Sequence, residues 1–193
     1  RFTCLVFGLT TAPFVFTKIM KPVATFLRKH GIRLIIYLDD MLVLGRSVTE
    51  LVHHKDLILS VFSHLGLLIN FEKSVLTPSQ KIEFLGYIID STRMTLFLPE
   101  TKVTNISELC RRMAESSDPV VAREVAQVLG KINATSGAIF PASLFSRYVQ
   151  IDLRKALNAG KSYNSKMWLS DRARNCLRLW PSKLRMFNGW SFQ

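Results

Sequence analysis

The sequence contains few cysteines, prolines and glycines, and it has no long hydrophobic run. Its three cysteines, Cys4, Cys110 and Cys176, are odd in number and far apart, which argues against a disulfide framework or a zinc knuckle and favours a reducing, intracellular compartment. With 7 prolines, 9 glycines and 48% hydrophobic residues among 193, the chain is expected to be folded rather than disordered. The apolar runs fall short of a membrane span and no signal peptide opens the chain, so we do not expect a membrane-spanning protein.

Acidic residues are scarce relative to basic ones. The chain carries 26 basic and 14 acidic residues, a net charge of +12. Residues 99–193 contribute 15 basic and 7 acidic residues, whereas residues 1–98 contribute 11 and 7. Such a charge favours a polyanionic partner, with nucleic acid as the first candidate and an acidic membrane surface as the second. The alternative is that the excess charge only aids solubility.

Hydrophobic periodicity in the first half predicts an α+β fold with an antiparallel sheet. Apolar residues at helical spacing predict one helix over residues 14–30 and another over residues 48–65, the latter capped by Ser47 or Thr49. Between them, Ile32 to Leu44 is expected to form a hairpin. Short strands are expected in the segments "LLINF", "SVLTP", "KIEFLGYIID" and "MTLFL".

Helices are predicted to dominate from Pro99 onward. Their expected ranges are 99–115, 119–135, 142–159 and 163–179. Asp118 is the expected cap of the second, with Pro119 at its first helical position. Basic and aromatic residues interleave here in a pattern suited to a polyanion: Arg147, Tyr148, Lys161, Tyr163, Lys166, Trp168, Arg174, Arg178 and Trp180.

Two adjacent acids, Asp39 and Asp40, interrupt the apolar run "IRLIIYLDDMLVLG". Aspartate favours turns, so the plain interpretation is a hairpin turn. However, both flanking strands are almost wholly apolar, the pattern of strands buried on both faces. A buried hairpin would place its tip in a cleft, where two carboxylates repel each other and are costly to desolvate. Mg²⁺ bound together with substrate phosphates would relieve that cost, which suggests metal-assisted phosphoryl transfer.

Four segments resemble the motifs of reverse transcriptases, in the family's order and within about ninety residues. "FGLTTAPFVFTKIM" resembles motif B, "YLDD" motif C, "LGLLINFEKS" motif D and "EFLGYIID" motif E, the primer grip. The segments "FLPETKV" and "EVAQVLGKINATSGAIFPA" further resemble DIRS-type retrotransposon polymerases. The resemblance implies a partial reverse-transcriptase palm over residues 1–98, followed by a mostly helical thumb and connection over residues 99–193.

The resemblance also implies a role for individual residues. Asp39 and Asp40 would be catalytic residues and ligands of Mg²⁺, of which the complete enzyme is expected to bind two ions. Lys73 would be the general acid for the leaving pyrophosphate, although it could equally be a solvated lysine. The nucleotide and template pocket would be shaped by Phe7, Gly8, Leu9, Ala12 and Pro13. The primer strand would be held by Tyr37, Leu38, Phe84, Leu85, Gly86 and Tyr87, the last four of which could equally form an ordinary core strand and turn.

The implied function is RNA-directed DNA polymerase activity, with dNTPs and a primed RNA or DNA template as partners and no membrane. Motif A, with a further catalytic aspartate, and the fingers are expected to lie N-terminal to Arg1, so we expect this chain alone to have little or no activity. A second hypothesis is a non-catalytic nucleic-acid-binding remnant of a retroelement. A third is a chain that folds poorly and aggregates through an exposed sheet edge.

Overall fold

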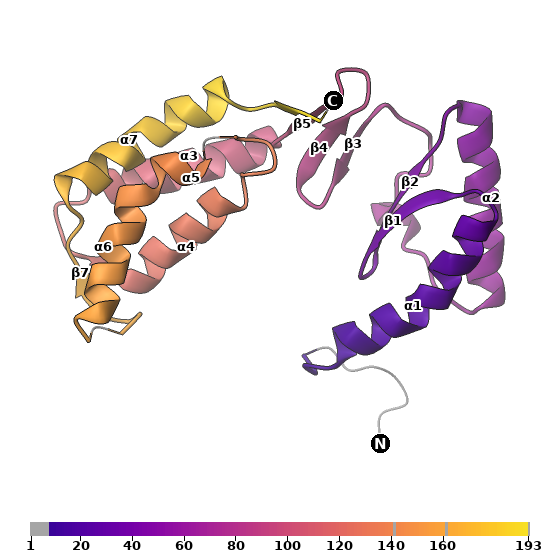
Figure 1. Ribbon diagram of the computed structural model, residues 1–193, viewed down its shortest axis with the longest axis horizontal. Coiled ribbons are helices and arrows are strands. Elements are labelled where there is room, and N and C mark those ends of the chain that lie inside the picture. Colours follow the sequence, from indigo (N-terminus) through magenta and orange to yellow (C-terminus); the bar gives the residue numbers. More distant parts are fainter. Residues whose placement is uncertain (1–7, 141, 161, 193) are drawn as a thin grey trace. The chain divides into compact units, whose positions relative to one another are not determined.

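The computed structural model describes residues 8–140, 142–160 and 162–192, which form helices and short strands (Figure 1). The chain divides into two compact units, Arg1–Ser79 and Gln80–Gln193. Every described strand pair is antiparallel, so the expected α+β fold is confirmed. None of the helices within the described ranges is both long and apolar enough to cross a membrane.

The first unit consists of a strand hairpin with a helix on either side of it in the sequence. Each helix is followed by a glycine with positive φ, Gly31 after the first and Gly66 after the second. This conformation lets the N–H of the next residue donate a hydrogen bond back to a carbonyl of the helix. After the second helix, Gly66 N donates to Ser63 O and Leu67 N donates to Phe62 O, which together form a Schellman motif. The elements are α1 (Ala12–Lys29), β1 (Arg33–Tyr37), β2 (Asp40–Leu44), α2 (Val48–His64) and the short 3₁₀ helix η1 (Phe71–Lys73).

One face of the β1–β2 hairpin packs on the two helices. The buried cluster contains Leu27 from α1, Leu34 from β1 and Ile58 from α2, with Ile36 and Val43 of the hairpin packed against it. The hydrophobic spacing of α1 and α2 therefore predicted both helices correctly. The Ser47 hydroxyl accepts a hydrogen bond from Glu50 N at 3.1 Å, which identifies Ser47 rather than Thr49 as the cap of α2.

Two expected strands of the first unit are absent from its described residues. The segments "LLINF" and "SVLTP" form η1 and irregular backbone instead. Leu68 is 99% exposed and Val75 is 64% exposed, so these apolar runs have no sheet neighbour to pack on. A short apolar run becomes a strand only where another strand pairs with it.

A four-stranded sheet opens the second unit, with strand order β3–β4–β5–β8. The predicted strand "KIEFLGYIID" is a tight hairpin rather than one strand, and "MTLFL" contains the expected strand. The last strand comes from the far end of the chain and pairs with β5 through Leu96 and Trp190. The strands are β3 (Lys81–Phe84), β4 (Tyr87–Asp90), β5 (Thr95–Phe97) and β8 (Trp190–Ser191).

Helices and one further strand pair complete the second unit. Its core includes Val103, Ile132, Val149, Leu177 and Trp180, all of which are fully buried. Helix α7 lies against α3 and α6. The helices are α3 (Glu100–Glu115), α4 (Ala122–Asn133), α5 (Ala142–Phe145), α6 (Arg147–Asn158) and α7 (Asp171–Met186), and the strand pair is β6 (Val120–Val121) with β7 (Lys166–Met167).

Three of the predicted helices in this unit have different bounds in the structure. Pro119 does not begin a helix, because Val120 and Val121 pair with β7 and α4 starts only at Ala122. The helix expected over residues 142–159 is two helices, α5 and α6. The helix expected over residues 163–179 runs instead from Asp171 to Met186, because β7 occupies the start of that range.

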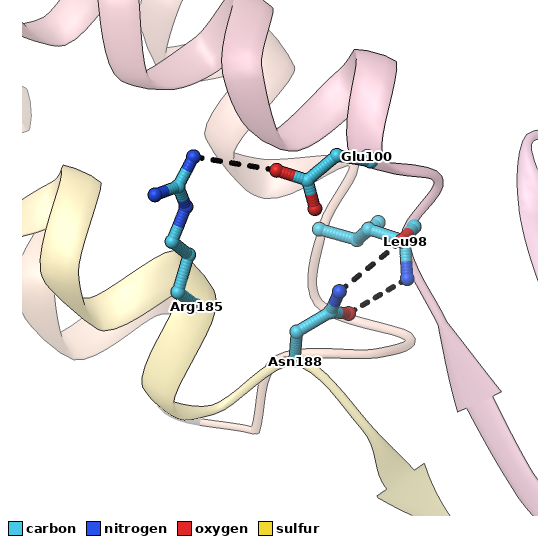
Figure 2. Close-up of polar contacts among 4 residues, drawn as sticks. All are labelled: Leu98, Glu100, Arg185 and Asn188. Atoms are coloured by element: carbon cyan, nitrogen blue, oxygen red, sulfur yellow. Dashed lines mark hydrogen bonds and ion pairs between the residues drawn. The ribbon is translucent and has the colours of Figure 1, made fainter.

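The end of helix α7 is bonded to the junction between β5 and α3 (Figure 2). The Asn188 side chain accepts a hydrogen bond from Leu98 N at 2.7 Å and donates one to Leu98 O at 3.1 Å, as a neighbouring strand would. Arg185 forms an ion pair of 3.3 Å with Glu100. These contacts join residues about ninety positions apart and fix the start of α3.

Candidate functional site

The acidic pair lies at the end of the β1–β2 hairpin. Tyr37 pairs with Asp40, so the connecting turn consists of Leu38 and Asp39 only, and Leu38 has a φ of 54°. Asp39 therefore occupies the turn, whereas Asp40 is the first residue of β2. The two acids belong to different local structures, although the expected hairpin itself is correct.

One face of the hairpin is buried, whereas the other is buried only in part. The face that carries Leu34 and Val43 packs on the helices. The opposite face carries Leu42, which is buried, but also Ile35 and Tyr37, which are 47% and 59% exposed. The expectation of strands buried on both faces was wrong for this unit, because α1 and α2 cover only one side of a two-stranded sheet.

Asp39 and Asp40 are both exposed, and neither forms an ion pair or a side-chain hydrogen bond within the described ranges. Their oxygens are therefore available to a hard cation such as Mg²⁺, which is commonly bound by one or two carboxylates together with phosphates and water. The described residues contain no cluster of three or more potential metal ligands. This unit thus offers two carboxylates to a metal, and any further ligand must come from substrate, water or another segment.

The segment expected to shape the nucleotide pocket lies at the start of helix α1. Phe7 is outside the described residues. Gly8 has a φ of 89°, which favours glycine, and Leu9 is 53% exposed. Ala12 N donates to Leu9 O at 3.0 Å, which closes the turn into the helix, and Pro13 lies in the first helical turn where its absent N–H is not needed. These residues form an exposed turn and helix start.

Lys73 is the last residue of η1 and is exposed. The Asn70 side chain caps this short helix by accepting a hydrogen bond from Lys73 N at 3.2 Å. The Ser74 hydroxyl donates to Asn70 O at 2.7 Å and closes the same turn. The spacing of Asn70 and Lys73 therefore has a structural basis, because the asparagine fixes the backbone that carries the lysine.

The segment expected to grip a primer forms the end of the β3–β4 hairpin. Phe84 pairs with Tyr87, and the turn residues Leu85 and Gly86 both have positive φ, at 50° and 74°. This sign pattern is typical of the type I′ turn that suits a two-residue hairpin. The Leu85 side chain is 43% exposed, whereas Phe84 and Tyr87 are half-buried.

Three residues to which the sequence analysis assigned no role contact this turn or Tyr87, which follows it. Lys102 on α3 donates a hydrogen bond from Nζ to Gly86 O at 3.0 Å. The Tyr87 hydroxyl donates to Ala134 O at 2.5 Å, and Gly137 lies beside the Tyr87 ring. These partners are 16 to 50 positions away in the sequence, and no local pattern indicates such long-range contacts.

The basic and aromatic residues of the second unit separate into two groups. Arg147, Tyr148, Lys166, Trp168 and Arg178 are exposed, together with Tyr163. In contrast, Arg174 and Trp180 are structural: Arg174 bonds to the Ala114 and Ser116 carbonyls at the end of α3, and Trp180 is fully buried. Lys161 is outside the described residues. The exposed group is the part of the pattern that a polyanion could reach.

Comparison with known proteins agrees with this geometry. Residues 1–89 match the family model of the reverse transcriptase (RNA-dependent DNA polymerase). Among solved structures, the foamy viral protease-reverse transcriptase dRH in complex with double-stranded DNA is similar in fold, with a TM-score of 0.68 and 18% identity over 94% of this chain. This chain spans 28% of the length of that chain. Residues 1–89 are therefore similar to the reverse transcriptase family, and the solved structure shows that the fold is shared over most of the chain.

Proposed function

We propose that this chain is part of an RNA-directed DNA polymerase that extends a primer by two-metal phosphoryl transfer. The observation that carries the proposal is the pair Asp39–Asp40, whose exposed carboxylates have no ion-pair partner among the described residues and lie at the end of a hairpin inside the family match. The foamy viral relative is described in complex with double-stranded DNA, which supports a nucleic-acid partner for this chain too. The partners are a primed RNA or DNA template and dNTPs.

The reaction joins the primer 3′-oxygen to the α-phosphorus of the incoming dNTP. The bond between that phosphorus and the oxygen leading to the β-phosphorus breaks, the 3′-hydroxyl gives its proton to solvent water, and pyrophosphate leaves. Asp39 and Asp40 would hold Mg²⁺, and the bound ion would polarise the phosphate and favour deprotonation of the 3′-hydroxyl. Lys73, exposed on a capped turn, would donate a proton to the leaving pyrophosphate.

Binding roles follow the positions of the remaining site residues. The turn and helix start from Phe7 to Pro13 would contact the nucleotide and template. Tyr37, Leu38 and the Phe84–Tyr87 segment would contact the primer strand. We further propose that residues 1–98 act as a palm and residues 99–193 as a thumb and connection, although Gln80 already begins the second compact unit. A DIRS-like retrotransposon origin is proposed from the segments around Pro99 and Gly130.

The metal site can be tested by titrating Mn²⁺ into the purified chain and measuring the free ion by electron paramagnetic resonance. Asp39→Asn and Asp40→Asn are each expected to weaken Mn²⁺ binding severalfold, because each removes one anionic ligand. Asp118→Asn, at an exposed loop acid of the other unit, is the matched control and should bind Mn²⁺ as the wild type does. Unchanged binding by both site variants would overturn the assignment of the pair as metal ligands.

Activity of the chain alone is expected to be low. Two-metal catalysis needs carboxylates that bridge both ions, and the described residues offer a single adjacent pair. Primer extension on a primed template, followed on a sequencing gel, should therefore yield little product. Extension at the rate of an intact polymerase would contradict this expectation.

A second candidate function is nucleic-acid binding without catalysis, which the basic excess of residues 99–193 favours. A basic surface binds the phosphate backbone in a salt-dependent manner and needs no metal. Duplex binding measured by fluorescence anisotropy separates the two functions. Binding that depends on salt, ignores Mg²⁺ and is unchanged in Asp39→Asn would favour the binding module, whereas Mg²⁺-dependent recognition of a primer end would favour the polymerase.

A further inference from the structure

The β3–β4 turn is held by contacts from outside its own hairpin. A hairpin of two four-residue strands is marginally stable by itself in water. Its end, formed by Leu85 and Gly86, requires positive φ at both residues, which a leucine adopts only at an energetic cost. Pairing of β4 with β5 supports the strands, but the turn itself lies beyond that pairing, so contacts made at the turn favour one conformation of it.

The first contact comes from Lys102 on helix α3. Its Nζ atom donates to Gly86 O at 3.0 Å and also lies 5.3 Å from the centre of the Tyr87 ring. An ammonium group over an aromatic ring gains further electrostatic stabilisation. A Cβ added to Gly86 would meet this same Nζ atom, so the ammonium fills the space that a side chain would need.

The second contact comes from Tyr87, the residue that follows the turn. Its hydroxyl donates to the carbonyl of Ala134, the residue that caps the end of helix α4. That carbonyl has no partner within the helix, so the tyrosine satisfies a group that helix ends leave unpaired. A Cβ added to Gly137 would lie 3.0 Å from the Tyr87 ring, so the loop after α4 approaches the ring closely.

We propose that Lys102 and Tyr87 are positioning residues that hold the Leu85–Gly86 turn against helices α3 and α4 in a single conformation. The primer strand would then meet the exposed Leu85 side chain and the turn backbone as a rigid surface. The proposal rests on the proposed function for its ligand, a primer strand. It also changes the expected role of Tyr87, because its hydroxyl hydrogen is already donated within the protein.

Amide hydrogen exchange and duplex binding by the full chain test the proposal together. Lys102→Met keeps most of the side-chain length and removes the donor, Lys102→Arg restores a donor, and Lys21→Met removes one charge from an exposed site on α1. Loss of one hydrogen bond should increase deuterium uptake around residues 84–87 roughly fivefold in Lys102→Met. Lys102→Arg should restore slow exchange, and Lys21→Met should leave it unchanged.

Binding is compared between a primed template with a recessed 3′ end and a duplex of equal length whose ends are closed by loops. The ratio of the two affinities removes the general effect of losing a positive charge, which weakens both complexes alike. Lys102→Met and Tyr87→Phe should each lower this ratio severalfold, whereas Lys21→Met should leave it unchanged. Faster exchange of the turn together with a lower ratio supports the proposal.

The contrary outcomes can be told apart. Unchanged exchange in Lys102→Met and Tyr87→Phe would overturn the holding contacts whatever the binding data show. Faster exchange with an unchanged ratio would show that the order of the turn does not matter to the primer, and would overturn the positioning role. Equal binding of both duplexes by the wild type would overturn the proposed primer contact itself, and the positioning role with it.

Discussion

Replacing Gly86 with alanine separates two contributions to the stability of the second unit. Gly86 has a φ of 74°, and an alanine in the left-handed region costs about 1–2 kcal/mol. The new Cβ would also displace Lys102 Nζ, which ends a flexible side chain and can move aside. The added loss is then the hydrogen bond from Lys102 to Gly86 O, about 0.5–1.5 kcal/mol. The unfolding free energy of this unit should fall by about 1.5–3.5 kcal/mol.

Gly160 offers a matched control in the same unit. Its φ is 80°, and a Cβ added there would meet nothing within 4 Å. Gly160→Ala should therefore cost only the backbone penalty of about 1–2 kcal/mol. Urea unfolding followed by tryptophan fluorescence measures both variants, because all three tryptophans, Trp168, Trp180 and Trp190, lie in this unit.

A double-mutant cycle completes the experiment. In a Lys102→Met background the hydrogen bond is already absent. There Gly86→Ala should lower the unfolding free energy by no more than Gly160→Ala does. If Gly86→Ala and Gly160→Ala lower the unfolding free energy equally in the wild-type background, the proposed contribution of the Lys102 hydrogen bond is refuted. That result would mean that the Lys102 contact adds no stability beyond what φ at the turn dictates.

Three further predictions concern the core, a helix cap and a thiol. Leu177→Ala should destabilise the second unit by about 2–5 kcal/mol in urea, because Leu177 is fully buried, whereas Leu179→Ala, at a 46% exposed position, should change little. Ser47→Ala should cost about 1 kcal/mol and speed amide exchange in the first turn of α2, since the serine hydroxyl caps that helix; normal exchange there would contradict this role. Burial raises the pKa of the Cys110 thiol to about 12, so at pH 8 it has almost no thiolate and iodoacetamide should leave it unmodified in the folded chain. Half-buried Cys176, whose pKa burial also raises, should react faster, and both should react in urea; rapid native labelling of Cys110 would show that it is not buried.

The sequence predicted those elements whose signals are local. Apolar residues at helical spacing located α1 and α2, and one of the two expected caps, Ser47, begins α2. The adjacent acids and their apolar flanks likewise predicted a hairpin. The exact turn residues could not be predicted, because they depend on the register in which Tyr37 pairs with Asp40. Residue types alone do not determine that register.

Errors appeared where tertiary contacts override local preference. Asp118 and Pro119 have the chemistry of a helix start, yet pairing of β6 with β7 delays α4 to Ala122. Helix α7 begins at Asp171, where the Ser170 hydroxyl accepts from Ala173 N, and that local capping signal could have been read from the sequence. The partners of the β3–β4 turn, in contrast, lie far along the chain and were not readable in any local window.

Within the described part of the chain, the β1–β2 hairpin of the first unit is open at both edges and carries the two carboxylates that we propose as metal ligands. In the described residues β1 and β2 pair only with each other, so the outer edge of each strand has backbone groups without a strand partner. The outer face also leaves Ile35 and Leu44 nearly half exposed. A further strand that pairs with this hairpin and carries a carboxylate would cover the edge and extend the metal site at once. Adding such a segment should therefore reduce aggregation and strengthen Mn²⁺ binding together. Light scattering measures the first and the Mn²⁺ titration the second, and a change in one without the other would contradict a common cause.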